Sequence, residues 1–467
     1  MSDATPPKSA VVKEERGPTG ALEVDAELTD NIAALLEAEQ RGMVLNLVAD
    51  LYPADLALLL SHLPFKYAHV VFSWLPPDKA SEVLTELDDA FRAALLRESP
   101  PGWIARLLQP LDTDDATDVL ADLPEDEALQ VLPNLRDAPE VHDLLNYPED
   151  TAGGLMAAEY VAVPYEMGVE QATEIVRAHA ESVDDVFVVF LIDEDQQLKG
   201  VLPIKQILLS PAGTRAIDIA ETDFISVTTD IDQEEVGRIM QRYDLVSLPV
   251  VDESGRLVGR ITIDDVVDVI RAEAEEDLQL MSGVSGDESL MASTFQISRG
   301  RLPWLLVGLF GASLSGTVIG TFESALEEAV VLATFIPIVT AMGGNAAVQS
   351  AAITVQGLTS GELWEGDALS RLGKELVVAL FNGIVLAALL CVFVLLFGMG
   401  NVPRLAATLG VTMLAVIVLA TTNGAVVPFL LQRFGLDPAS AMGPFVTTLN
   451  DIIGLTVYFL IALALYL

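Results

Sequence analysis

Five long apolar stretches follow residue 299. They run roughly over residues 303–322, 329–355, 375–399, 405–431 and 441–467. Each reaches the length of about 20 residues that a helix needs to cross the hydrocarbon core of a bilayer. Five buried helices of this length and apolar content in a row would be an unusual coincidence in a soluble protein. The pattern therefore predicts a transmembrane domain of five helices over residues 299–467.

Shorter amphipathic segments fill residues 31–150. Leu-Pro and Leu-Asp steps recur there at intervals of about twelve residues or multiples of it, each followed by apolar positions at helical spacing. Examples are Leu63-Pro64, Leu75-Pro76, Leu111-Asp112 and Leu123-Pro124. Pro and Asp are favoured in the first turn of a helix. We expect an acidic helical repeat domain whose short antiparallel helices stack into a superhelix, preceded by a polar, disordered tail over residues 1–30.

Over residues 151–265 the pattern changes to short β-branched strands that alternate with helices. The clearest unit covers residues 224–270 and contains the phrase SLPVVDESGRLVGRIT at 247–262; a weaker copy covers residues 160–209. Two such α/β units in tandem resemble a pair of CBS domains. CBS pairs often bind adenine nucleotides, so the resemblance implies a nucleotide in the cleft between the copies, although no phosphate-binding glycine loop is present.

The charge is distributed as unevenly as the hydrophobicity. The formal net charge is −43, and 59 of the 68 acidic residues precede residue 299. This acidity excludes nucleic acid as a partner, because Lys and Arg are needed to displace counterions from phosphates. The lone Cys391 excludes a disulfide framework and a Cys-based zinc site. Basic residues flank the spans in a way that predicts a multi-pass protein of the inner (plasma) membrane, in contact with lipid, with a cytoplasmic N-terminus and an extracytoplasmic C-terminus.

Asp451 is the carboxylate that lies well inside a predicted span. An ionised Asp there costs about 2.5–3.5 kcal/mol on insertion scales, which suggests a use. Magnesium keeps most of its waters and takes one or two carboxylates. Thr447, Thr448 and Asn450 add oxygen ligands nearby, and a symmetric dimer would supply a second Asp451. The alternative is an Asp near a helix end that reaches interfacial water.

A second group of carboxylates occupies the predicted linker (plug) helix over residues 266–298 and the residues just before it. Asp265, Asp268, Glu273 and Glu276 recur at spacings that place them on one helical face. Like charges at this spacing destabilise a helix unless cations intervene. We expect a cation-sensing switch beside the first span. The alternative is the solvated acidic surface of a salt-adapted protein.

These pieces resemble one family over nearly the whole chain after residue 30, the MgtE magnesium transporters. The motifs that carry the resemblance are NYPEDTAGGLM at 146–156, MGGNAAVQSAAITVQGLTSGE at 342–362 and FGLDPASAMGPFVTTLNDIIG at 434–454. The family implies a homodimeric, magnesium-gated channel whose pore is lined by the second and fifth spans, with Asn345, Thr447, Thr448 and Asn450 as its lining here. The segment after Asn345 departs from the family at Ala347 and Val348, and Gln356 stands where relatives often have Arg.

The same resemblance assigns the Mg²⁺ ligands. Asp451 matches the family's pore aspartate, and Asp437 matches an acidic residue near the cytoplasmic mouth. Asp265, Asp268, Glu273, Glu276 and Asp277 match regulatory ligands between the linker helix and the cytosolic domains. Mg²⁺ is thus both the transported and the regulatory ion.

The resulting hypothesis is a channel that imports Mg²⁺ down the membrane potential. At low cytosolic Mg²⁺ the acidic domains repel each other and the pore opens; at high Mg²⁺ the ions bridge the carboxylates and close it. One alternative is a transporter of another divalent cation, such as Co²⁺ or Mn²⁺. Another is a membrane-anchored cation sensor that conducts nothing. The four histidines are scattered without metal-site spacing, and no nucleophile with its base is found, so we predict no enzyme.

Overall fold

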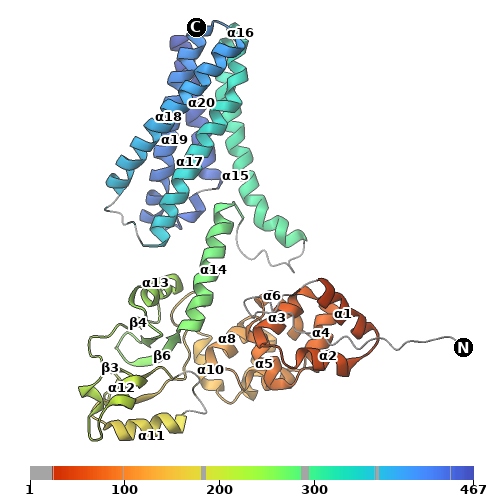
Figure 1. Ribbon diagram of the computed structural model, residues 1–467, viewed down its shortest axis with the longest axis vertical. Helices are drawn as coiled ribbons and strands as arrows, with labels where there is room; N and C mark the ends of the chain where they lie inside the picture. Colours follow the sequence, from red (N-terminus) through yellow and green to blue (C-terminus); the bar gives the residue numbers. More distant parts are fainter. Residues whose placement is uncertain are drawn as a thin grey trace, which may run out of the picture. The chain divides into compact units, whose positions relative to one another are not determined.

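The computed structural model describes residues 24, 26–97, 99–179, 183, 186–284, 294–361, 363, 366, 368–441 and 443–467. The chain divides into two compact units, Met1–Val269 and Ile270–Leu467 (Figure 1). The disorder expected for residues 1–30 falls mostly outside the described residues. Residues 26–30, however, already belong to the first helix, α1, so the tail is shorter than predicted.

The first part of the N-terminal unit consists of short helices around one continuous apolar core, which runs from Ile32 to Val141. Pro lies in the first turn of the helices that begin after residues 52, 76 and 100, where its missing N–H costs nothing. This confirms the expected helical repeat. The helices are α1 (Ala26–Glu37), α2 (Arg41–Val48), α3 (Pro53–His62), α4 (Phe65–Trp74), α5 (Pro77–Thr85), α6 (Asp89–Leu96), α7 (Pro101–Leu108), α8 (Thr113–Ala121), α9 (Glu125–Val131) and α10 (Ala138–Leu144).

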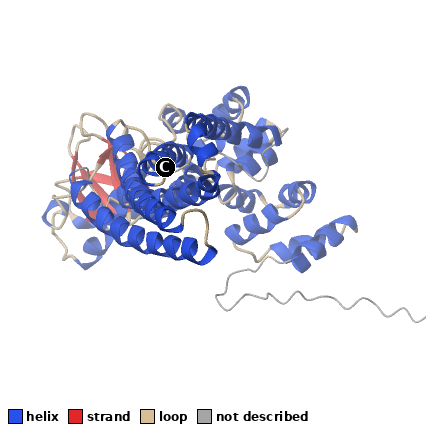
Figure 2. Cartoon of the chain, turned by 90° about the horizontal axis from the view of Figure 1, so that it is seen from above, coloured by secondary structure: helices blue, strands red, loops and turns tan. Residues whose placement is uncertain are grey.

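Two three-stranded sheets of identical topology follow. In each sheet the first strand pairs parallel with the second, which pairs antiparallel with the third. The strands are β1 (Ala162–Pro164), β2 (Val188–Ile192) and β3 (Leu198–Pro203), then β4 (Val227–Thr228), β5 (Ser247–Val251) and β6 (Leu257–Thr262), with helices α11 (Val169–His179), α12 (Ile204–Leu209) and α13 (Gln233–Tyr243). Figure 2 shows the strands gathered in one region of an otherwise helical chain. The tandem CBS-like repeat is thereby confirmed.

Helix α14 (Ile263–Met281) begins directly after β6 and contains the boundary between the two units. The side chains of Asp264 and Asp265 accept hydrogen bonds from the hydroxyl of Thr262. The side chain of Asp265 also accepts one from the backbone N–H of Thr262. Carboxylates at this end of a helix are favoured by the partial positive charge of the first turn. The predicted linker continues over residues 285–293, which lie outside the described residues.

Five helices of the C-terminal unit are long and apolar enough to cross a membrane, which confirms the five predicted spans. Helix α19 lies in their centre and packs against α17, α18 and α20, while α15 packs against α20. The helices are α15 (Thr294–Thr321), α17 (Ile336–Thr359), α18 (Ala368–Phe397), α19 (Val402–Arg433) and α20 (Pro444–Leu465), with the short α16 (Glu323–Glu328), η3 (Val330–Phe335) and η5 (Ala439–Ala441) between them. Helix α15 starts nine residues before the predicted Pro303, because hydropathy marks the apolar run and not the polar turns that extend a helix beyond it.

Candidate functional site

Asp451 lies on α20, one turn after Thr447. Its side chain is partly exposed in the protomer. Among the described residues, none forms a hydrogen bond or ion pair with it. The hydroxyl of Thr447 donates to the carbonyl of Gly443, 3.2 Å away. The Asp451 carboxylate is therefore free to bind a cation or a cation's water shell.

Neighbouring residues of α20 hold the helix in place. Asn450 is 2% exposed and packs against Gly343 of α17, where an added methyl group would lie 2.7 Å from Asn450 Nδ2. Thr448 packs in the same way against Gly311 of α15. Small residues at such crossings allow helices to approach closely. Within the protomer Asn450 thus packs between helices, and its place in the pore lining stays a prediction; Thr447 lies on the face of Asp451.

Helix α17 carries a polar stripe on its open face. Asn345, Gln349 and Gln356 are exposed and recur at intervals of four and seven residues, so they lie on one side of the helix. The opposite side is buried and carries small residues, and the carbonyl of Ala347 there lies where a side chain on Gly424 of α19 would be. A lipid-facing helix has no use for three amides. We call Asn345, Gln349 and Gln356 the amide stripe.

The C-terminal end of α14 meets the polar end of this bundle. Leu280 and Met281 pack against an apolar cluster formed by α17, α19, η5 and α20, whose buried members are Ala347, Ala351, Val355, Ala420, Ala439 and Val446. Nearby, burial raises the pKa of Asp277 to about 6, and the carboxylate of Asp437 adds to the rise. Two of the predicted ligands thus face each other with like charge. Asp437 itself is exposed and accepts a hydrogen bond from the backbone N–H of Ala439, 2.8 Å away.

A second meeting of carboxylates occurs in the N-terminal unit, between α8 and the start of α14. Burial raises the pKa of Asp115 to about 7, and Asp265 adds to the rise. The pKa of Asp114 is also raised well above its usual range, by burial and then by Asp265. The pKa of Asp265 is raised to about 6, again chiefly by burial. We call Asp114, Asp115 and Asp265 the acidic interface.

Two cations, Arg92 and Arg260, act on the acidic interface. Arg92 is buried, and its Nε donates to Asp122 Oδ2 at 2.7 Å while its Nη2 donates to Asp89 Oδ1 at 2.9 Å. Its charge lowers the pKa of Asp115 but is outweighed by burial. Asp268 is exposed. Burial raises the pKa of Glu86, and the charge of Asp268 adds to this rise. Arg260 lowers the pKa of Asp265, but by less than burial raises it. With both cations nearby, the pKa of each of the three carboxyls of the acidic interface still stays raised.

Helix α8 is fixed to the chain that enters the first sheet. The carboxylate of Glu159 accepts hydrogen bonds from the backbone N–H of Thr113, at 3.1 and 3.2 Å, and from its hydroxyl at 2.6 Å. The same hydroxyl accepts from the N–H of Ala158 at 2.9 Å. These bonds cap the first turn of α8 and hold the acidic residues that follow it.

The predicted regulatory ligands are not assembled into one metal cage. In the described residues no three carboxylate, imidazole or thiol groups lie close enough to hold a metal ion together. Glu276 is exposed, and Glu273 and Asp277 are partly exposed on α14. Sequence reasoning did not find Asp114 and Asp115, although the run TDDATD at 113–118 is a signal for them. The assignments of metal ligands stay predictions.

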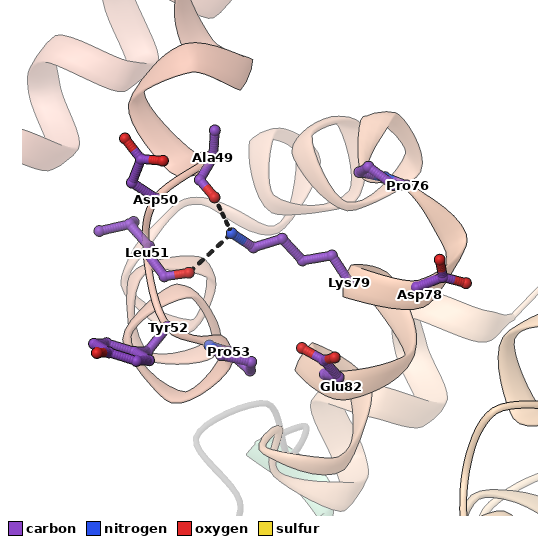
Figure 3. Close-up of a pocket in the computed structure, with 9 residues that line it drawn as sticks. All are labelled: Ala49, Asp50, Leu51, Tyr52, Pro53, Pro76, Asp78, Lys79 and Glu82. Carbon is purple, nitrogen blue, oxygen red and sulfur yellow. Dashed lines mark hydrogen bonds between the residues drawn. The ribbon is translucent and has the colours of Figure 1, made fainter. Parts of the chain in front are cut away.

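The helical domain also contains an open hollow of about 510 Å³ around Lys79. Figure 3 shows the lysine pointing at main-chain oxygens. Its Nζ donates to the carbonyls of Val48, Ala49 and Leu51, at 2.9, 2.6 and 2.8 Å. All three N–H bonds of the ammonium group are thus used to satisfy carbonyls at the end of α2. The hollow is lined by Asp50, Asp78 and Glu82 as well, so it offers no anion site.

Three parts of the chain match known protein families. Residues 336–461 match a family described as divalent cation transporters. Residues 51–150 match the MgtE intracellular N domain, and residues 152–213 and 216–272 match the CBS domain. A solved structure described as the cytosolic domain of the Mg²⁺ channel MgtE in complex with ATP covers 51% of this chain and 99% of its own, at 38% identity and a TM-score of 0.48.

Whole-length relatives agree. The magnesium transporter MgtE of Thermus thermophilus is 36% identical over 436 residues, which cover 92% of this chain and 96% of the relative. That of Bacillus subtilis is 33% identical over 421 residues, which cover 90% and 93%. These relatives are transporters and not enzymes, as predicted. The chain belongs to the MgtE family of magnesium transporters.

Proposed function

We propose that two copies of this chain form a channel that admits Mg²⁺ to the cytoplasm. The observation that carries the proposal is the amide stripe on α17, together with the unpaired carboxylate of Asp451 on the packed neighbour α20. Polar groups in this position need water or a second protein surface. A second copy related by a two-fold axis covers the stripe and supplies a second Asp451.

Hydrated Mg²⁺ suits this environment. The ion keeps several waters and binds through one or two carboxylates, and amides donate to or accept from those waters. The membrane potential drives a dication inward with about 4.6 kcal/mol per 100 mV, twice the value for one charge. With the soluble unit in the cytoplasm, Asp437 lies at the inner mouth and the C-terminus on the outer side.

Gating follows from the carboxylates of α14 and α8. When cytosolic Mg²⁺ is high, ions bridge Asp114 or Asp115 with Asp265, and Asp277 with Asp437; Asp268, Glu273 and Glu276 contribute further oxygens. Helix α14 then stays packed on the bundle through Leu280 and Met281. When Mg²⁺ is low, the carboxylates repel each other, and this packing loosens. Opening requires no ATP hydrolysis.

An adenine nucleotide at the CBS pair is the further ligand that the family suggests. The structure of the relative described in complex with ATP supports it. Calorimetric titration of the full chain with ATP, with and without Mg²⁺, tests this assignment directly. If no heat of binding is measured at millimolar ATP, the CBS pair binds no ATP and the nucleotide has no part in gating.

The decisive experiment is uptake into liposomes that contain the purified full chain, at low internal Mg²⁺ and under an imposed negative-inside potential. Asp451→Ala should abolish uptake. Glu327→Gln is the matched control, because Glu327 is exposed on α16 between the first two spans. Competition by Co²⁺ and Mn²⁺ separates a magnesium channel from a transporter of another divalent ion. A folded, dimeric parent that carries no Mg²⁺ would favour the non-conducting sensor.

A further inference from the structure

A buried polar bridge connects α17 with α18. The hydroxyl of Ser350 donates to Glu375 Oε2 at 3.0 Å. The other oxygen, Oε1, accepts from Arg371 Nη2 at 2.6 Å, one turn earlier on α18. Ser350 is 3% and Glu375 8% exposed. Both oxygens of one buried carboxylate are therefore used, one for an ion pair within α18 and one for a hydrogen bond to α17.

This bridge is a direct tie between two helices that do not pack along each other. Helices α17 and α18 both pack extensively on α19. Small residues of α17, such as Ala347, allow close approach to α19, and packing contacts are less directional than a hydrogen bond, so they restrain rotation about the helix axis less sharply. A directional hydrogen bond resists such rotation. The Ser350–Glu375 contact thus adds a directional restraint to that of the packing.

The restraint acts on the helix that presents the amide stripe. Ser350 follows Gln349 by one residue, so its side chain points about 100° away from that of Gln349. Thr354, one turn further, is fully buried on the same side as Ser350. A rotation of α17 by about 30° would move side-chain ends, about 5–6 Å from the axis, by about 3 Å. That distance exceeds the tolerance of a hydrogen bond to an ion's water shell.

The buried charges of this bridge contribute little to stability, which suggests that the bridge has another role. A buried ion pair gains little net stability over apolar residues of similar size, because both charges lose their water. Arg371 has a further cost, since its Nε is buried without a hydrogen-bond partner among the described residues. Buried polar groups that are retained in this way often fix one arrangement among several of similar energy.

We propose that Glu375 is a positioning residue for ion passage: through Ser350 it fixes the rotation of α17 and so keeps Asn345 and Gln349 on the ion path. The inference rests on the proposed channel function. Glu375 touches no ion itself. Its own charge is balanced by Arg371, so it acts on the ion through the orientation of α17.

Ser350→Ala tests the proposal because it removes the bridge and leaves the Arg371–Glu375 pair intact. Thr354→Val is the matched control: Thr354 is buried on the same side, but its hydroxyl donates only to the carbonyl of Ser350 in its own helix, at 2.9 Å. Mg²⁺ uptake into liposomes should fall by roughly fivefold in Ser350→Ala, the factor that corresponds to one hydrogen bond of about 1 kcal/mol. Competition by Co²⁺ should strengthen at the same time, because loosely placed amides discriminate less between hydrated ions. Ser350→Thr, which keeps a hydroxyl, should restore both properties.

Melting temperature and dimer content, measured for each variant, separate positioning from general packing. Uptake and competition in Ser350→Ala that equal those of the parent would overturn the inference and leave the channel function standing. An equal loss in Ser350→Ala and Thr354→Val, with lower melting temperatures in both, would also overturn it. If the parent itself carries no Mg²⁺, the proposed function fails, and the inference fails with it.

Discussion

Replacement of Asp115 by Asn should stabilise the N-terminal unit when divalent cations are absent. Asp115 is partly buried on α8, and its pKa is raised to about 7 by burial and by Asp265. A raised pKa means that the folded state holds the proton more tightly than the unfolded state. The folded state therefore loses stability as pH rises from about 4 to about 7, and the loss is complete above that range. A neutral Asn avoids this loss.

The size of the effect follows from the same pKa. The interval from 3.8 to about 7 corresponds to about 4 kcal/mol, at roughly 1.4 kcal/mol per pH unit. This is an upper bound, since solvent reaches part of the side chain and the neighbouring chain relaxes. We expect Asp115→Asn to raise the free energy of unfolding by about 1–2 kcal/mol at pH 8. This corresponds to a rise in melting temperature of about 2–8 °C for a domain of this size.

The assay is thermal unfolding of the full chain in detergent with a chelator, followed by tryptophan fluorescence. Asp126→Asn is the control, because Asp126 is exposed on α9 of the same domain. The gain of Asp115→Asn should shrink by more than half between pH 8 and pH 5, where the parent carboxyl is protonated in the folded state. It should also shrink when Mg²⁺ is added to the parent at pH 8. An equal gain in the two variants, or a gain that does not change with pH, would refute the reasoning.

Three further predictions concern separate contacts. Gly343→Ala should lower melting temperature and Mg²⁺ uptake, because the new methyl group would lie 2.7 Å from Asn450 Nδ2, whereas Gly344→Ala meets nothing within 4 Å and should behave as the parent. Glu159→Gln should destabilise the N-terminal unit by about 1 kcal/mol in chemical unfolding, the usual value of a helix cap; an unchanged midpoint would show that Thr113 needs no cap. Leu280→Ala should raise uptake at high internal Mg²⁺ by loosening α14, while Leu278→Ala, 64% exposed on the same helix, should not.

Sequence predicted those parts of the fold that depend on local pattern. The five spans follow from runs of apolar residues, and the strands of the second CBS-like unit from β-branched residues around the turn at Gly255, whose φ of +81° needs glycine. The ends of helices were less predictable. Helix α15 begins at Thr294, before the apolar run, and includes Arg299 and Arg301. Polar residues can extend a helix beyond its apolar part, because the backbone hydrogen bonds do not depend on hydropathy.

The site was predicted only where its residues are close in sequence. Asp451 was visible because one carboxylate interrupts an apolar run. Asn450 stands a step of about 100° around the helix from Asp451 and packs against Gly343 in the protomer, a contact that sequence spacing alone does not predict. Asp115 and Asp265 come together across 150 residues, and no local pattern records that contact. The ion pair of Glu375 does have a local signal in the sequence, because Arg371 precedes it by four residues, one helical turn, on the same helix.

Glu375 and the acidic interface differ in how their carboxylates are neutralised, and this difference bears on where a cation would be sensed. Glu375 has Arg371 at 2.6 Å and a hydroxyl on its other oxygen, so a cation gains little by approaching it. Asp114, Asp115 and Asp265 have Arg92 and Arg260 nearby, but Arg92 already pairs with Asp89 and Asp122, and the pKa of each of the three carboxyls stays raised. A salt-adapted surface would spread its charge in water, where neutralising one carboxylate changes little. The comparison of Asp115→Asn with Asp126→Asn therefore decides between sensing and surface acidity: only a sensor makes the buried carboxylate costly until Mg²⁺ arrives.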